Sequence, residues 1–242
     1  MAFAEGFCLN SPVAIMSAKL PPGQRAIDHF PRFGVLAYAG RLPKRPVVPE
    51  LHLLAKDKSS SSVRAEDLGE LQRKELVADF HCVTSWSRCG LRWSGYGFKD
   101  FYEQFVVPRV RPEADDRFVE FTALDGYRTS VLLTDLLQEN VVLADRLDGE
   151  PLSLEHGAPF RLVVPDLYAY KSVKHVSTMS LRKDFRRGLA DRQTLAHPRG
   201  RVALEERGRG LPGPLYRVIY RALIPATLWY YRRFGTRGAR RE

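Results

Sequence analysis

The sequence of 242 residues is poor in cysteine and has no long apolar run. Its three cysteines, Cys8, Cys82 and Cys89, cannot all pair within one chain, and their spacing matches no zinc-binding pattern. No run approaches the ~18 consecutive apolar residues that a membrane-spanning helix requires. The first 18 residues contain neither lysine nor arginine, so the positively charged start of a signal peptide is missing. We therefore expect a reduced, cytoplasmic protein that is stabilised by its core rather than by disulfide bonds.

An excess of positive charge is missing from most of the chain. The formal net charge is +10, yet residues 182–242 alone hold 16 Lys or Arg against 5 Asp or Glu. The 181 residues before them hold 22 basic and 23 acidic residues and are therefore nearly neutral. Because the body carries no basic excess, no nucleic-acid partner is expected, and the basicity belongs to a C-terminal segment.

The middle of the chain alternates apolar and polar residues with a period of two, which is typical of half-buried strands. Turn residues separate these runs, above all Asp125-Gly126 and Asp148-Gly149. Helical periodicity is short there, and neither a βαβ alternation nor an internal repeat is visible. The pattern therefore predicts a strand-rich α+β fold. The predicted strands cover residues 76–83, 117–123, 141–144, 160–164 and 172–179.

Cys82 is the first residue with candidate chemistry. It lies near the end of a predicted strand, and the residues that follow it, VTSWSRCG, are expected to form a loop. A thiolate there, near Arg88 and Arg92, is suited to act as a soft metal ligand or as a nucleophile. A single cysteine on an apolar strand face is more often inert packing, so the residue type alone does not decide between the two interpretations. Cys89 is interpreted as a spare thiol.

A second group of residues has the chemistry of an anion site. His156, Arg161, Lys171 and Lys174 lie within 19 residues, separated by small residues and flanked by predicted strands. Arginine offers a planar fork to phosphate oxygens, lysine a point charge, and Ser172 with nearby backbone N–H groups further donors. A solvated basic loop is the alternative. The flanking strands favour the interpretation in which these groups are held near the core.

These motifs together resemble the molybdopterin-binding domain of the sulfite oxidase family. The runs DFHCVTSWS, FTALDGYRTSVLLTD and VLADRLDGEPLSLEHGAPFRLVVPDLYAYKSVKHV have the order and spacing of that family, over about residues 20–181. The similarity is greatest to the compact bacterial branch that is related to the catalytic subunit of periplasmic methionine-sulfoxide reductase. The resemblance implies a mixed β-sheet or barrel core with short helices.

The resemblance also implies a molybdenum–molybdopterin cofactor and the residues that hold it. Cys82 matches the cysteine whose thiolate coordinates molybdenum. Residues 33–38 match an N-terminal segment that contacts the cofactor, although Ala37 stands there in place of the commoner polar residue. The positions that match other cofactor-contacting residues are Thr122, His156, Arg161, Ser172, Val173 and Lys174.

The implied function is two-electron oxygen-atom transfer of the sulfite-oxidase or sulfoxide-reductase type. The expected substrate is a small oxyanion or a sulfoxide, with Arg88, Arg92 and Arg128 as candidates to steer it. Because no haem domain is encoded, electrons are expected to come from or go to a separate partner. The rival hypothesis is a catalytically degenerate protein, either a cofactor-binding protein or a membrane-associated adaptor.

The chain departs from the family pattern after Ser180. Three parts are predicted: an extension over 1–19, an oxidoreductase domain over 20–181, and a basic, partly helical segment over 182–242. Residues 217–233 mix apolar and aromatic side chains with arginines, which is typical of a segment that lies on an anionic membrane surface. A helix that packs on its own domain is the alternative.

Overall fold

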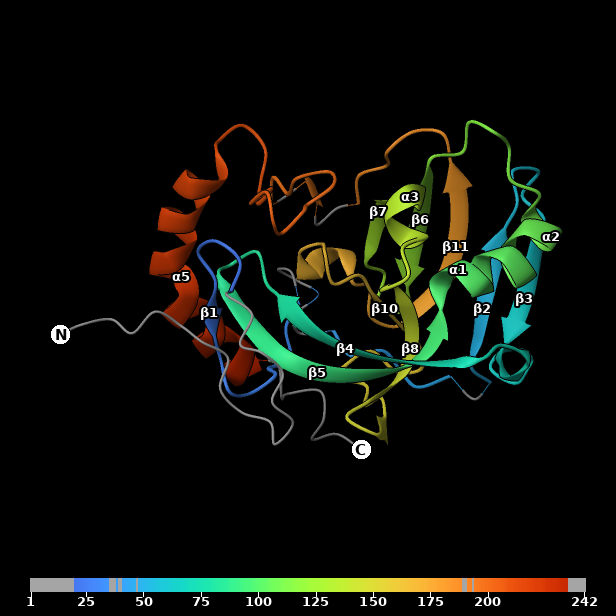
Figure 1. The fold of residues 1–242 in the computed structure, drawn as a ribbon, viewed down its shortest axis with the longest axis horizontal. Helices are drawn as coiled ribbons and strands as arrows, with labels where there is room; N and C mark the ends of the chain where they lie inside the picture. Colours follow the sequence, from blue (N-terminus) through green and yellow to red (C-terminus); the bar gives the residue numbers. More distant parts are fainter. Residues whose placement is uncertain are drawn as a thin grey trace.

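Two β-sheets dominate the fold of the chain in this computed structural model (Figure 1). One sheet has six strands and the other has five, and the described helices are mostly short. This arrangement confirms the strand-rich α+β class expected from the sequence. The predicted extension over residues 1–19 lies outside the described part of the chain. The structure describes residues 20–34, 38, 41–46, 48–188, 191–192 and 194–234.

The six-stranded sheet is built around its longest strand, β5 (Trp86–Gly97). β5 pairs antiparallel with β4 (Arg73–His81) and with β8 (Val142–Leu147). The short β1 (Arg25–Ala26) adds to β5 in parallel orientation. Two strands extend the sheet beyond β8, and both are antiparallel to it: β9 (Glu150–Pro151) and β10 (Arg161–Val163).

The five-stranded sheet contains one parallel pair, formed by β2 (Glu50–Leu54) and β11 (Val176–Arg182). β3 (Ser60–Arg64) forms an antiparallel hairpin with β2. On the other side of β11, β6 (Phe118–Ala123) and β7 (Arg128–Leu132) continue the sheet in antiparallel order. β6 buries every second residue, as its alternating sequence predicts.

The helices flank the sheets rather than alternate with the strands. β5 leads directly into a continuous helical stretch, formed by α1 (Phe98–Phe101), η3 (Tyr102–Val106) and α2 (Val107–Val110). The long helix α5 (Gly213–Phe234) lies on the opposite side of the molecule in Figure 1 and contains Pro225. No described helix is both long and apolar enough to cross a membrane. Short helices elsewhere are η2 (Asp67–Glu70), α3 (Leu133–Leu136) and η4 (Ala169–Lys171).

The core divides into two clusters of buried side chains. The larger one joins the five-stranded sheet to the helical stretch after β5 and includes the fully buried Phe121. The smaller one is rich in aromatic residues and contains Phe80, Trp86 and Trp93 from β4 and β5. Cys82, which directly follows β4, belongs to this smaller cluster. The candidate thiol is therefore held against a packed aromatic core.

Alternation and turn residues locate most of the strands correctly. The predicted turns at Asp125-Gly126 and Asp148-Gly149 are confirmed, and both glycines have positive φ angles, 85° and 89°. The confirmed strands are those predicted over 76–83, 117–123, 141–144 and 160–164, which correspond to β4, β6, β8 and β10.

Two local predictions are wrong. The loop expected after Cys82 spans only residues 83–85, because β5 begins at Trp86 and pairs back onto β4. The strand predicted over 172–179 begins only at Val176. Residues 172–174 instead belong to an irregular segment that follows η4, and this places their side chains beside the cysteine turn rather than in a sheet.

Candidate active-site cavity

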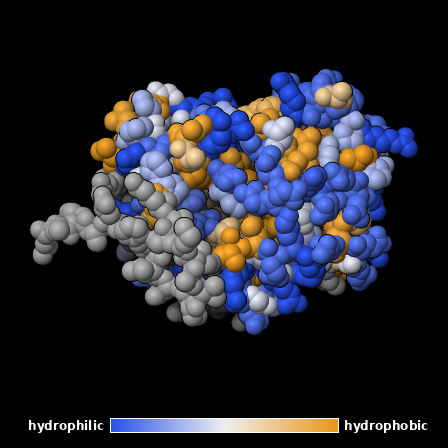
Figure 2. All heavy atoms as spheres, viewed as in Figure 1, coloured by the Kyte–Doolittle hydropathy of each residue, from blue (hydrophilic) through white to orange (hydrophobic). Residues whose placement is uncertain are grey.

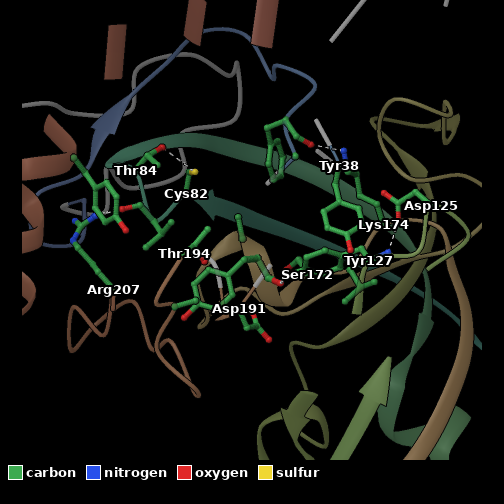
Figure 3. A pocket seen from close by; sticks show the side chains of 18 of the residues that line it. Tyr38, Cys82, Thr84, Asp125, Tyr127, Ser172, Lys174, Asp191, Thr194 and Arg207 are labelled. Carbon is green, nitrogen blue, oxygen red and sulfur yellow. Dashed lines mark hydrogen bonds between the residues drawn. The ribbon is translucent and has the colours of Figure 1, made fainter. Parts of the chain in front are cut away.

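A cavity of about 530 Å³ lies where distant segments of the chain meet. The turn after β4 contributes Cys82 and Thr84 to its wall, and the segment that follows η4 contributes Lys174. The C-terminal segment contributes Arg207 and Tyr220. In Figure 3, Cys82 lies between Arg207 on one side and Lys174 on the other. The cavity therefore has a thiol in its middle and a cation toward each end.

A tight turn presents the Cys82 thiol to this cavity. The Cys82 N–H donates to the carbonyl oxygen of Trp86 (2.8 Å), and the Ser85 N–H donates to the carbonyl oxygen of Cys82 (3.1 Å). Ser85 has a positive φ angle of 75°, which is rare for a residue other than glycine. The Cys82 Sγ lies 3.1 Å from the Thr84 Oγ1. Both ends of the turn are thus fixed by the pairing of β4 with β5.

Burial raises the pKa of the Cys82 thiol, while the hydrogen bond from Thr84 and the charge of Arg207 act in the opposite direction. Because burial dominates, the thiol on its own is protonated at neutral pH. A metal ion in contact with the sulfur removes that proton, since a coordinating thiol is deprotonated. The surroundings therefore suit a metal ligand better than a free nucleophile.

Arg161 is fully buried in a box of aromatic rings. Its guanidinium carbon lies between 4.7 and 5.7 Å from the ring centroids of Phe30, Phe33, Phe80 and Trp93. One nitrogen donates to the carbonyl oxygen of His156 (2.8 Å), but Nε and Nη2 have no partner within the described structure. Burial lowers the pKa of Arg161 to about 9. A buried arginine with unused N–H groups is costly unless an anion pairs with it.

Lys174 lies beside this arginine and lines the cavity. Its ammonium group donates to the carbonyl oxygens of Phe33 and Glu155, and no described carboxylate lies within ion-pair distance of it. Burial, together with the positive charge of Arg161, lowers the pKa of Lys174 to about 7. Gly157 permits the close approach of these segments, because a Cβ there would lie 3.2 Å from atoms of both residues.

His156 belongs to the same region but does not line the cavity. Its ring stacks on Phe30 at a centroid distance of 4.7 Å. Burial lowers the pKa of His156 to about 4, and the neighbouring charges of Arg161 and Lys174 act in the same direction. The imidazole is therefore neutral near pH 7. The backbone carbonyl of His156, not its ring, accepts the hydrogen bond from Arg161.

The structure brings together some of the predicted cofactor residues and not others. Cys82, Ser172, Val173 and Lys174 line the cavity, and Arg161 and His156 lie behind that wall. Thr122 lies on β6, where its carbonyl oxygen accepts a hydrogen bond from Ser177, and it does not contribute to the cavity wall. Its role remains a prediction.

The N-terminal contact segment is described only in part. Phe33, Gly34 and Tyr38 line the cavity, as the expected contact over 33–38 requires. Ala37 lies outside the described residues, so the effect of its missing polar group stays a prediction.

The three arginines proposed to steer substrate lie away from the cavity wall. Arg88 donates to the carbonyl oxygen of Cys89 (2.7 Å), and the exposed Arg92 is paired loosely with Asp148 (4.0 Å). Arg128 is exposed and lines a neighbouring open groove, which shares Tyr38 with the cavity. Arg128 is therefore the best placed of the three.

Two features were not expected from the sequence. Arg207, from the basic C-terminal segment, is buried and lines the cavity beside the cysteine turn. No local pattern marks this residue, because its contacts depend on residues more than one hundred positions earlier in the chain.

Cys89 is disulfide-bonded, which corrects its interpretation as a spare thiol.

The donor set of the cavity fits a metal that is carried by an organic cofactor. No group of three or more His, Cys, Asp or Glu side chains suited to hold a metal occurs in the described residues. A metal at Cys82 would thus take most of its ligands from a non-protein group. The cavity volume is in the range of cofactor sites, and Lys174 in the wall, with the buried charge of Arg161 behind it, suits the anionic part of such a group.

A comparison with protein families agrees with this chemistry. Residues 48–189, more than half of the chain, match the model of the oxidoreductase molybdopterin-binding domain. The chain belongs to this family. The resemblance to the sulfite oxidase family is thereby confirmed, and with it the molybdopterin-dependent oxidoreductase class.

Individual relatives differ in how much of their length the chain covers. It is 32% identical to the uncharacterized oxidoreductase YuiH of Bacillus subtilis, over 76% of this chain and 89% of the relative. It is 28% identical to the protein-methionine-sulfoxide reductase catalytic subunit MsrP of Xanthomonas campestris, over 50% of this chain but only 40% of the relative. Among solved structures, the sulfane dehydrogenase SoxCD of Paracoccus pantotrophus has a TM-score of 0.48 at 17% identity, covering 56% and 38% of the two chains.

Proposed function

We propose that this protein binds molybdenum–molybdopterin through Cys82 and catalyses two-electron oxygen-atom transfer. The observation that carries the proposal is that one cavity is lined by the buried Cys82 thiol and by Lys174, with the buried Arg161, two of whose nitrogens have no partner in the described structure, behind it. Oxygen-atom transfer requires a centre that changes its oxidation state by two, and the molybdenum cofactor supplies that chemistry when it is bound.

In this proposal the residues of the chain bind and orient rather than react. Cys82 provides the protein ligand, and the Thr84 hydroxyl is placed to hydrogen-bond to its sulfur. Lys174 and Arg161 neutralise the anionic part of the cofactor, and each charge-assisted hydrogen bond contributes about 1.5–3 kcal/mol. The aromatic lining, which includes Tyr38, excludes water and strengthens these interactions.

The substrate and the redox partner are also proposals. A small oxyanion or a sulfoxide fits the family, and the name of the relative MsrP refers to methionine-sulfoxide reductase. We propose that electrons pass through a separate protein, since the relative MsrP is named as the catalytic subunit of a reductase. Arg128, in the groove next to the cavity, is the residue best placed to guide an anion toward it.

Metal and pterin analysis of the purified protein tests the proposal. Expression in a host that makes the cofactor should give about one molybdenum per chain. A chain that folds in that host but contains neither molybdenum nor pterin would instead support the rival hypothesis of a degenerate protein or an adaptor. Molybdenum without turnover on either sulfite or sulfoxides would support a cofactor-binding protein that has lost catalysis.

We further propose that α5 gives the protein a peripheral contact with anionic membranes. Leu215, Val218 and Ile219 on this helix are exposed, with 46%, 66% and 43% of their surface accessible. In Figure 2, orange apolar surface is visible at the upper left, over the region where Figure 1 places α5. The helix carries four arginines and no acidic residue, which is the combination that anionic surfaces attract.

A further inference from the structure

Arg207 is almost fully buried, as Arg161 is, and all its donors are used. Nη1 donates to the carbonyl oxygen of Val83 (2.7 Å) and to the hydroxyl oxygen of Ser85 (3.0 Å). Nη2 donates to the carbonyl oxygen of Pro22 (3.0 Å) and reaches the Glu205 carboxylate (3.3 Å), which Nε also approaches (3.4 Å). A guanidinium has five N–H groups, so none is left for a ligand.

These contacts exclude a role for Arg207 in substrate binding. An arginine that lines the cavity next to Cys82 would ordinarily be assigned to bind an anionic substrate. Arg207 has no free donor for that purpose, and Glu205 balances its charge. Only 1% of its surface is accessible, which keeps it from turning toward the cavity without breaking these bonds.

The contacts of Arg207 instead converge on the cysteine turn. Val83 and Ser85 are two of the three residues that separate Cys82 from β5. Ser85 holds a positive φ angle, a conformation that persists only when the surroundings enforce it. One nitrogen of the guanidinium group, Nη1, bridges Val83 and Ser85 from outside the turn. This bridge fixes the direction in which Cys82 leaves β4.

Helix α5 is linked to the same turn. The Glu205 carboxylate that pairs with Arg207 also accepts hydrogen bonds from Arg217, which lies on α5. One turn further along the helix, Tyr220 lines the cavity. The chain of contacts from Arg217 through Glu205 to Arg207 thus connects the C-terminal helix, which lies beyond the matched family domain, to the cysteine turn.

We propose that Arg207 is a positioning residue: it holds the turn that aims the Cys82 thiolate at the metal, and it does not bind substrate. The proposal rests on the function of Cys82 as the metal ligand. Residues that orient a metal ligand without touching the metal commonly change metal affinity or activity by about 10- to 100-fold when they are replaced. Arg207 is of this kind, and the segment after residue 189 therefore belongs to the working site.

The test compares Arg207→Gln and Arg207→Lys with the control Arg201→Gln. Arg201 lies in the same segment and has an ion pair of its own with Glu206, but it does not line the cavity. Arg207→Lys keeps the charge and is the variant that preserves the fold, but a single ammonium group cannot span Val83 and Pro22. The readouts are amide exchange of the peptide around residues 82–87 in cofactor-free protein, molybdenum content after loading, and the separate effects on kcat and KM.

Both Arg207 variants should exchange these amides about tenfold faster, since buried hydrogen bonds are lost. They should also lower molybdenum content and kcat by about tenfold or more, with KM nearly unchanged, while the control behaves like the wild type. Full molybdenum content, wild-type exchange and a raised KM would overturn the proposal and make Arg207 a substrate-binding residue. Wild-type exchange and molybdenum content in Arg207→Lys would equally overturn it, because the fork would then be dispensable. If the wild type itself takes up no molybdenum, the proposed function fails, but the exchange measurement still decides whether Arg207 holds the turn.

Discussion

Arg161 and Arg207, the two most deeply buried of the described arginines, occupy opposite electrostatic surroundings. Arg161 has aromatic rings around it and two nitrogens without a partner in the described structure. Arg207 has a carboxylate, a hydroxyl and two backbone carbonyls as acceptors. Burial of a charge is expensive unless it is paired, so the unpaired arginine indicates a site that is completed by a ligand. The fully paired one indicates a structural tie, although both lie near the same cavity.

Replacing the cysteine should have the largest effect, because Cys82 is the proposed protein ligand of the metal. Cys82→Ser is expected to abolish turnover and to remove most of the bound molybdenum, since a hydroxyl is a harder and far less acidic ligand than a thiol. The change in volume is small, so the thermal unfolding of cofactor-free protein should shift little. Turnover at the wild-type rate in this variant would contradict the ligand assignment. Ser94→Ala, at a buried site on β5, is a control for small changes in the same sheet.

The two arginines should respond oppositely when their charge is removed from cofactor-free protein. Arg207→Gln should lower the free energy of unfolding by about 1–3 kcal/mol, because Val83, Ser85 and Pro22 lose a buried hydrogen-bond donor and Glu205 keeps only Arg217 as its partner. Arg161→Met should leave that free energy unchanged or raise it, because the native guanidinium has no carboxylate partner. Chemical denaturation of both variants without cofactor measures the difference. Equal destabilisation would show that the aromatic box alone compensates the charge of Arg161.

Cofactor content should show the opposite importance of Arg161, together with Lys174. Arg161→Met and Lys174→Ala are expected to lower pterin and molybdenum content although the fold remains, since each removes donors to the anionic part of the cofactor. Full occupancy in both variants would remove the cationic cluster from the site.

The pH dependence of stability tests whether the cation beside Arg161, Lys174, is charged in the cofactor-free protein. Its pKa is lowered to about 7 in the folded protein, mainly by burial, from a value of 10.5 for an unperturbed lysine. Between these two values the unfolded chain binds the proton and the folded protein does not, so the stability of cofactor-free protein should rise with pH from about 7 to about 10. Lys174→Met should flatten that rise, whereas substitution of the exposed Lys183 should not. An unchanged slope in Lys174→Met would show that the lysine stays charged in the fold.

Sequence alone predicts those parts of the fold that local patterns determine. Alternation identified β6 and β8, but it missed β5, whose sequence contains Gly95 and Gly97. Glycine usually weakens a strand, yet here a Cβ at Gly95 would lie 2.2 Å from the carbonyl oxygen of Leu143, so the close pairing with β8 requires it. The reason for that glycine is visible only in the tertiary structure.

The residues of the candidate site also divide into those that local sequence motifs reveal and those that only the tertiary structure reveals. Cys82 and Lys174 belong to motifs that can be read within short stretches, and the structure places both in the cavity wall. Arg207 reaches Val83 across 124 positions, and nothing in its own neighbourhood distinguishes it from the other arginines of the basic segment. A charge run in a sequence therefore conceals a member such as Arg207, which is structural because of its long-range contacts.

The smallest expected effect concerns the outer face of α5, whose inner side is tied to the cysteine turn through Arg217. Full-length protein should bind anionic liposomes reversibly, with about 1 kcal/mol from each basic residue close to the surface. Because salt screens this attraction, binding should fade as the salt concentration rises above physiological values. Val218→Glu places a negative charge on the exposed apolar face and should weaken binding, whereas Val77→Glu, also at an exposed valine but on β4, should not. Sedimentation with vesicles of anionic and of neutral lipid measures both variants. If wild-type protein ignores anionic vesicles even at low salt, or if both variants lose binding alike, α5 only covers the cavity and makes no contact with membranes.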